Sequence, residues 1–186
     1  MTEEVKKACR IMAGGGLIAY PTDTVWGIGC DATDEAAVEK VYNLKRRADR
    51  KAMIVLLDTV AKLEIYVENI PNVAWQLIEA FDSPLTIIYE HGRNLASNLT
   101  AADGSIGIRV TREAFSNALC KRFRKPVVST SANVSGEPFP TNYSKISSII
   151  LGGVDYVVDY RRDDRLQRAP SGIIRLGDGG LFEMIR

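Results

Sequence analysis

The spacing of two apolar segments near the N-terminus limits the kinds of sheet that this chain can form. Residues 17–20 and 25–30 both have the character of short buried strands, and only residues 21–24 lie between them. Parallel neighbours need a crossover of about a dozen residues or more, so no crossover helix can join these two strands. Helical and strand patterns then alternate irregularly along the chain. The sequence therefore predicts an α+β fold, of the three-layer α/β type, in which helices cover a mixed sheet.

The other elements follow from the period of the apolar residues. Helices are predicted over residues 3–13, 33–44, 60–66, 73–81 and 113–123, and Thr33 or Asp34 can cap the second of them. Strands are predicted at residues 53–57, 85–89, 106–110 and 127–128, and near Tyr156, Ile173 and Phe182. A chain of 186 residues that is 46% hydrophobic can bury one core, so we expect a single domain over residues 1–186.

Charge and cysteine content exclude several classes of protein. Lys and Arg total 24 against 23 for Asp and Glu, so the net charge of +1 gives no overall reason to bind a polyanion, and any anion site must come from local clustering. Cys9, Cys30 and Cys120 match no metal-ligand spacing and are expected to be buried, reduced thiols. No segment resembles a signal peptide or a membrane span, so we expect a cytoplasmic protein.

The densest local charge lies between a predicted helix and a predicted buried strand. Residues 45–51 contain five basic side chains in seven positions. A solvated basic face is the simpler interpretation of such a cluster taken alone. Its position favours a binding role, because ligands of α/β proteins sit at sheet edges of this kind. Arg grips phosphate oxygens bidentately and Lys supplies a point charge, so the cluster suits a nucleotide triphosphate.

Three other segments carry weaker signals. Residues 129–136 concentrate hydroxyls, an amide and a glycine in a predicted loop that could bond phosphate or ribose, although such loops are more often plain turns and no Walker motif is present. His91 is the only histidine, which argues against a Ser-His-Asp triad or a multi-histidine metal site. Residues 161–165 alternate in charge and are expected to form a solvated loop without a role.

Four motifs, in order along the chain, resemble those of the YrdC family. They are residues 20–32 (YPTDTVWGIGCDA), the pair Lys45 and Arg47, residues 105–110 (SIGIRV) and residues 129–136 (STSANVSG). Any one of them is weak evidence, whereas together they span nearly the whole chain. The chain is similar to the short, single-domain form of the family. It also keeps the Lys-x-Arg pair and the Ser-Ala-Asn loop that a related paralogue group lacks.

The resemblance implies a strongly twisted mixed sheet around a basic concave cleft, in which threonine and ATP lie side by side. The pair Lys45 and Arg47 is expected to be catalytic through contact with the triphosphate. Residues 171–173 read Ser-Gly-Ile where the family commonly has Ser-Thr-Val, and residues 51–52 read Lys-Ala where it has Asn-Pro. The positions that match threonine contacts are Thr24, Arg109, Ser131 and Ser171. The positions that match nucleotide contacts are Lys45, Arg47, Lys51, Ser105, Asn133, Thr141 and Arg186.

The family makes L-threonylcarbamoyl-AMP from L-threonine, bicarbonate and ATP with release of pyrophosphate, the first step of threonylcarbamoyladenosine formation in tRNA. The same nucleotidyltransferase activity is the expectation here, with Mg²⁺ carried by the ATP phosphates rather than by protein side chains. A tRNA-modifying transferase complex is the expected consumer of the product. The alternatives are an RNA-binding module that uses the basic cleft together with the second cluster at residues 121–125, and a paralogue with an altered substrate.

Overall fold

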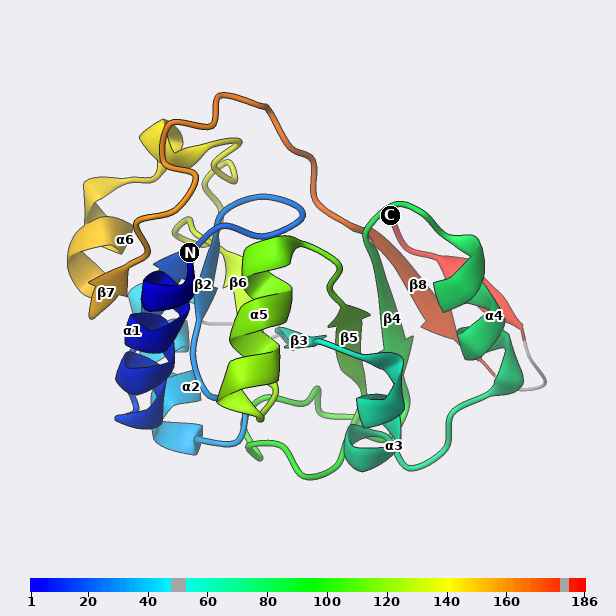
Figure 1. Ribbon diagram of the computed structural model, residues 1–186. Helices are drawn as coiled ribbons and strands as arrows, with labels where there is room; N and C mark the ends of the chain where they lie inside the picture. Colours follow the sequence, from blue (N-terminus) through cyan, green and yellow to red (C-terminus); the bar gives the residue numbers. More distant parts are fainter. Residues whose placement is uncertain (48–52, 178–180) are drawn as a thin grey trace.

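The computed structural model describes residues 1–47, 53–177 and 181–186, which form nine strands and six α-helices (Figure 1). The strands are β1 (Ile18–Tyr20), β2 (Gly27–Gly29), β3 (Ile54–Leu57), β4 (Leu85–Tyr89), β5 (Ile106–Val110), β6 (Val127–Ser131), β7 (Tyr156–Val157), β8 (Gly172–Leu176) and β9 (Phe182–Met184). The helices are α1 (Thr2–Ala13), α2 (Glu35–Leu44), α3 (Leu63–Tyr66), α4 (Asn72–Ala80), α5 (Ala114–Phe123) and α6 (Ser148–Gly153), with 3₁₀ turns η1 (Val60–Lys62) and η2 (Tyr143–Lys145).

A single mixed sheet contains every strand of the described residues, in the order β7-β1-β2-β6-β3-β5-β4-β8-β9. β1 and β2 are antiparallel, with Ala19 opposite Ile28, in accord with the short connection between them. Three pairs are parallel, namely β1 with β7, β3 with β5, and β4 with β8, and the other neighbours are antiparallel. The predicted mixed sheet is therefore confirmed.

Alternate residues of each strand point to opposite faces of the sheet, and each face has its own helices. On one face, Tyr20 and Leu56 pack into a cluster with the apolar sides of α1 and α5, which lie side by side in Figure 1. On the other face, Val55 and Ile108 join a larger cluster with α2 and α4. This arrangement gives the three layers that the sequence predicts.

Side-chain caps explain where two of these helices begin. The Asp34 carboxylate accepts hydrogen bonds from the backbone N–H groups of Ala36 and Ala37, so Asp34, and not Thr33, caps α2. Glu113 caps α5 by accepting from the backbone N–H of Ser116 at 2.7 Å. Both caps satisfy donors that a helix cannot pair internally, which stabilises the starts of the elements that flank the central strands.

The structure corrects the sequence prediction at two elements. β6 continues to Ser131, because Ser129 lies opposite Ile54 of β3 and Thr130 lies opposite Ile28 of β2. The first three residues of the predicted serine-rich loop are therefore strand. The short helix α6 was not predicted, since its six residues are too few to show a clear apolar period.

The cysteines match the prediction of buried thiols at two of three positions. All three cysteines are free, and Cys30 and Cys120 are buried whereas Cys9 is only half-buried. Within the described ranges, none of the helices combines the length and the apolar character that crossing a bilayer requires.

Candidate functional site

A cavity of about 260 Å³ opens on the sheet face that α1 and α5 leave partly uncovered. Ser129 lies opposite Ile54, and Arg109 lies opposite Leu56 two residues further along β3, so Ile54, Arg109 and Ser129 share this face. The turn before β2, the end of α2 and the C-terminal residues complete the walls. The lining residues are Thr24, Val25, Gly27, Arg47, Met53, Ile54, Arg109, Ser129, Thr130, Ser131, Phe139, Pro170, Ser171, Ile173 and Arg186.

The cavity brings together six of the predicted site residues from segments far apart in the sequence. Three of the six are arginines, and no Asp or Glu is among the lining residues that the structure describes. Guanidinium groups and hydroxyls converging in one concavity suit a ligand that carries carboxylate or phosphate groups. The six residues are Thr24, Arg47, Arg109, Ser131, Ser171 and Arg186.

Four of the other five predicted positions are described, and they do not line this cavity. Ser105 is buried at the start of β5, where its backbone N–H donates to Asp103. Thr141 accepts a backbone hydrogen bond from the N–H of Arg168. Asn133 binds inside its own loop, because its Nδ2 donates to the carbonyls of Val134 and Glu137 at 3.1 and 2.7 Å. Lys45 is buried just after α2, and Lys51 lies outside the described residues.

Lys45 is a buried residue that fastens the loop after β6. Only 3% of it is exposed, and its Nζ donates to the backbone oxygens of Ser131 at 2.5 Å and Asn133 at 2.8 Å. Burial, with a smaller contribution from the charge of Arg47, lowers the pKa of Lys45 to about 8. The alternative interpretation, a solvated basic face, is therefore excluded for Lys45. Its ammonium instead joins the end of α2 to two other predicted site residues.

The turn that contains Thr24 is held by its own hydroxyl groups. The Thr22 hydroxyl donates to the backbone oxygen of Val25 at 2.8 Å and accepts from the backbone N–H of Thr24 at 3.0 Å. The two threonine hydroxyls lie 3.0 Å apart, and both residues are buried. Thr24 thus reaches the cavity from a closed turn in which the Thr22 hydroxyl bonds two backbone groups.

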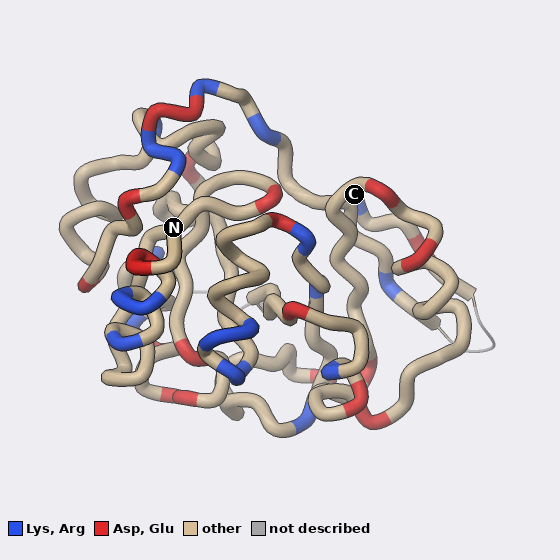
Figure 2. Tube along the Cα trace, viewed as in Figure 1, with Lys and Arg blue, Asp and Glu red and all other residues tan. Residues whose placement is uncertain are grey.

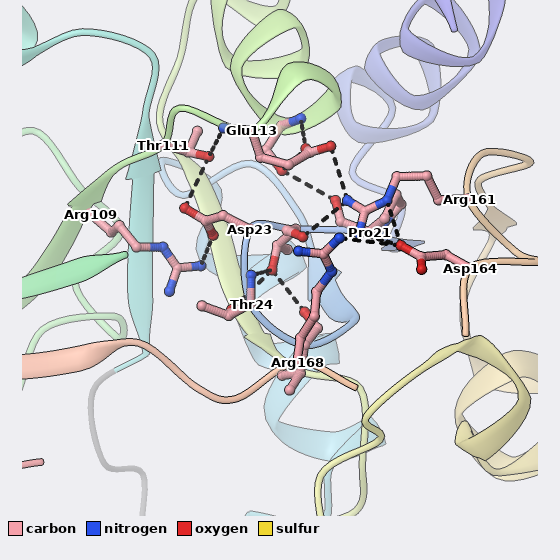
Figure 3. A network of polar contacts seen from close by, with 12 residues as sticks. Pro21, Asp23, Thr24, Arg109, Thr111, Glu113, Arg161, Asp164 and Arg168 are labelled. Carbon is pink, nitrogen blue, oxygen red and sulfur yellow. Dashed lines mark hydrogen bonds and ion pairs between the residues drawn. The ribbon is translucent and has the colours of Figure 1, made fainter. Parts of the chain in front are cut away.

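Arg109 and Asp23 form an ion pair beside this turn (Figure 3). Nη2 of Arg109 lies 3.1 Å from Oδ1 of Asp23, and only 4% of the arginine side chain and 13% of the aspartate side chain are exposed. Burial raises the pKa of the Asp23 carboxyl, while the Arg109 guanidinium acts in the opposite direction. The Thr111 hydroxyl donates to the other Asp23 oxygen at 3.4 Å. Sequence reasoning selected Arg109 but not Asp23.

The C-terminal side of the cavity is built by Ser171 and Arg186. The Ser171 hydroxyl lies 2.9 Å from that of Thr86 on β4, and its backbone oxygen accepts from Nε of Arg186 at 3.1 Å. Burial and the nearby Arg109 charge both lower the pKa of Arg186. Arg186 thus lines the same cavity as Arg109.

Comparison with known proteins places this arrangement in a family. A profile of the Sua5, YciO and YrdC proteins, described as "Telomere recombination", matches residues 10–186. The chain belongs to this family. A threonylcarbamoyl-AMP synthase from Stutzerimonas stutzeri (strain A1501) is 34% identical over 184 residues, which cover 98% of this chain and 96% of that protein.

Solved structures of the Sua5/YciO/YrdC family share the fold. P. abyssi Sua5 complexed with L-threonine superposes with a TM-score of 0.85 at 25% identity over 98% of this chain. The match covers 53% of the P. abyssi protein, so this chain spans about half of its length. E. coli YciO matches with a TM-score of 0.86 at 24% identity, covering 100% of this chain and 89% of YciO.

In this member of the Sua5/YciO/YrdC family, the segment after β7 braces the site. Only 19% of the Arg161 side chain is exposed, and its Nη1 donates to the Thr22 backbone oxygen at 3.3 Å and to Glu113 at 3.1 Å. Asp164 binds the other edge of the same guanidinium at 2.9 Å (Figure 3). The prediction that residues 161–165 form a solvated loop without a role is therefore wrong for Arg161 and Asp164, whereas Asp163 and Arg165 are exposed. No signal local to those residues could have revealed contacts so distant in sequence.

Proposed function

We propose that this chain synthesises L-threonylcarbamoyl-AMP from L-threonine, bicarbonate and ATP, with release of pyrophosphate. The observation that supports this most directly is the convergence of three arginines and several hydroxyls on one cavity whose described lining contains no Asp or Glu side chain. Relatives named threonylcarbamoyl-AMP synthase are similar to this chain over nearly its whole length. A single domain over residues 1–186, acting in the cytoplasm, would carry the whole site.

The cavity divides into two proposed halves. Arg109 and Thr24, with Ser131 and Ser171, would hold the threonine, because a strand-borne guanidinium can bond a carboxylate through two parallel N–H groups. Arg47, at the other wall, would hold the phosphates as a catalytic residue. The remaining proposed nucleotide contacts are Lys45, Lys51, Ser105, Asn133, Thr141 and Arg186.

The reaction needs positioning and neutralisation of charge more than acid–base catalysis. Bicarbonate supplies CO₂ by losing hydroxide, the threonine amine adds to the CO₂ to form a carbamate, and the proton that the amine loses leaves with the hydroxide as water. A carbamate oxygen then bonds the α-phosphorus of ATP while the bond to the bridging oxygen of the β-phosphate breaks, so that pyrophosphate leaves with the electron pair. Arginine side chains that hold both reactants in line and offset the developing negative charge are sufficient for this role, and histidine is not required.

Mg²⁺ is proposed to enter with the nucleotide. The described residues contain no group of three or more His, Cys, Asp or Glu side chains arranged to hold a metal ion. The cavity lining offers hydroxyls and carbonyls, which could complete a coordination sphere that phosphates and water mainly supply. When bound, the ion would neutralise phosphate charge, and the arginines would add to that effect.

Pyrophosphate release tests this proposal. Purified protein should release pyrophosphate from ATP only when threonine and bicarbonate are both present. Arg47→Ala should lose activity, whereas the matched control Arg10→Ala, on α1 outside the cavity, should keep it. Release that does not depend on threonine would refute the proposed substrate, and a fully active Arg47→Ala variant would refute the proposed phosphate site.

One observation favours a second, RNA-binding function. The predicted second basic cluster lies in an open groove of about 910 Å³ between α1 and α5, and no carboxylate is among its described lining residues. Figure 2 shows Lys and Arg gathered along α1 and at one end of α5. Phosphate backbones are recognised through such clusters. The basic residues of the groove are Lys6, Arg10, Lys121, Arg122, Arg124 and Lys125.

Fluorescence anisotropy with a labelled tRNA stem would test this second function. The double variant Lys121→Glu and Arg122→Glu should weaken binding at least tenfold and reduce its dependence on salt, while pyrophosphate release stays unchanged. Retained binding would exclude the groove as the site. If Arg47→Ala weakened binding instead, the cavity rather than the groove would be the RNA site. Transfer of the product to a tRNA-modifying complex remains a prediction.

A further inference from the structure

Arg109 is a buried cation with almost no protein partners. The ion pair with Asp23 is its only polar side-chain contact with the described residues, and its Nε is fully buried without a hydrogen-bond partner. A guanidinium carries five N–H donors, and leaving them unpaired in a protein interior is costly. Because Arg109 lines the cavity, the missing acceptors would be supplied by a ligand carboxylate.

Asp23 lies beside that guanidinium as an ion-pair partner, with its Oδ1 3.1 Å from Nη2 but without a hydrogen bond of its own. It contacts a single nitrogen, Nη2, while Nε of Arg109 stays buried without a hydrogen-bond partner. Asp23 is itself held, because the Thr111 hydroxyl donates to its second oxygen and the hydroxyl-bonded turn at Thr22 and Thr24 encloses it. Figure 3 shows Asp23 between Arg109 and Thr111, with Thr24 beside it.

We infer that Asp23 is a positioning residue, which orients Arg109 so that its remaining N–H groups meet the carboxylate of the amino-acid substrate. This inference rests on the proposed function. An arginine side chain loses considerable rotamer freedom when it binds a ligand. A fixed carboxylate beside one nitrogen already restricts the side chain, so less conformational entropy is lost when the substrate binds. Asp23 would thus act on threonine affinity without touching threonine.

Calorimetric titration of the Asp23→Asn variant tests the inference. Threonine affinity should fall about tenfold, as expected for a weakened bond to a charged group, while ATP affinity should stay within about twofold of wild type. The matched control is Asp31→Asn, since Asp31 is also buried and paired, but its partner Lys125, at 2.5 Å, does not line the cavity as Arg109 does. The control should leave both affinities unchanged.

Two further variants guard against a fold defect and against a merely structural role. Asp23→Glu keeps the charge next to Arg109 but displaces the carboxylate by one methylene, so it should fold and still lose threonine affinity. The double variant Asp23→Asn with Arg109→Lys should bind threonine as weakly as Arg109→Lys alone and no more weakly, because Asp23 acts through Arg109.

The outcomes separate this inference from the proposed function. If wild-type protein neither binds threonine nor releases pyrophosphate, the proposed function fails. If wild type does both, and either Asp23→Asn or Asp23→Glu binds threonine as tightly as wild type does, then only the positioning role fails. Additive effects in the double variant, or an equal loss of threonine and ATP affinity, would also overturn it, since both indicate a general structural contribution.

Discussion

Lys45 offers a direct test of the site through the pH dependence of stability. Its pKa is about 8 in the folded protein against 10.5 when exposed, mainly because it is buried. Between these two values the unfolded chain binds more protons than the folded chain, so the free energy of unfolding must rise with pH. The cost of the buried charge is fully present below about pH 8 and disappears as the pH approaches 10.5.

The magnitude follows from the same two pKa values. The lowered pKa of a residue that is 3% exposed corresponds to about 3 kcal/mol in total, of which about 2 kcal/mol should be recovered between about pH 7 and pH 9.5. Lys45→Met keeps a similar stem and removes the titration. Urea unfolding of both proteins at several pH values gives the difference in unfolding free energy, in which other titrating groups largely cancel.

That difference, wild type minus variant, should increase with pH. A flat difference would refute the reasoning, and would mean that the bonds from Nζ to Ser131 and Asn133 offset the burial. Repeating the series with saturating ATP tests the proposed nucleotide contact. A triphosphate near Lys45 would raise its pKa and move the increase to higher pH. An unchanged curve would place Lys45 outside the nucleotide site.

Three further predictions concern other parts of the chain. Arg109→Lys and Thr24→Ala should each weaken threonine binding about tenfold or more and leave ATP binding unchanged, as measured by calorimetry; the reverse pattern would exchange the two halves of the cavity. Gly29→Ala should cost about 1–3 kcal/mol in urea unfolding, because an added Cβ would lie 2.7 Å from the Tyr20 ring, and an unchanged midpoint would contradict that packing. Asp34→Ala should cost about 1 kcal/mol through loss of the α2 cap while kcat stays unchanged; a lower kcat would connect that helix start to the site.

The elements that sequence predicts well are those whose apolar period is local. The sequence predicts β4 and β5 at the residues observed, because β4 is a short apolar run and β5 alternates with glycine, each between clear boundaries. Thr33 and Asp34 are both candidates for the N-cap of α2. Asp34 takes this role because the Thr33 hydroxyl donates to the Asp31 carboxylate. Where two adjacent residues can both cap a helix, contacts made after folding decide between them.

The features that sequence could not give depend on partners far along the chain. β6 extends to Ser131 because β2 and β3 lie on either side of it, and nothing in a run of serines and threonines indicates this. Arg161 binds the backbone oxygen of Thr22, 139 residues earlier. Six predicted site residues do line one cavity, and they came from family motifs rather than from local pattern. Their roles remain predictions.

The charge within the site shows why a nearly neutral chain can still bind polyanionic substrates. The Arg47 charge contributes to the lowered pKa of Lys45, and the Arg109 charge to that of Arg186, so like charges in and beside the cavity repel one another. The fold holds these cations together at a cost in stability, which contacts elsewhere must offset. A carboxylate and a triphosphate supply the opposite charge. Negative groups bound at both ends of the cavity would offset this repulsion.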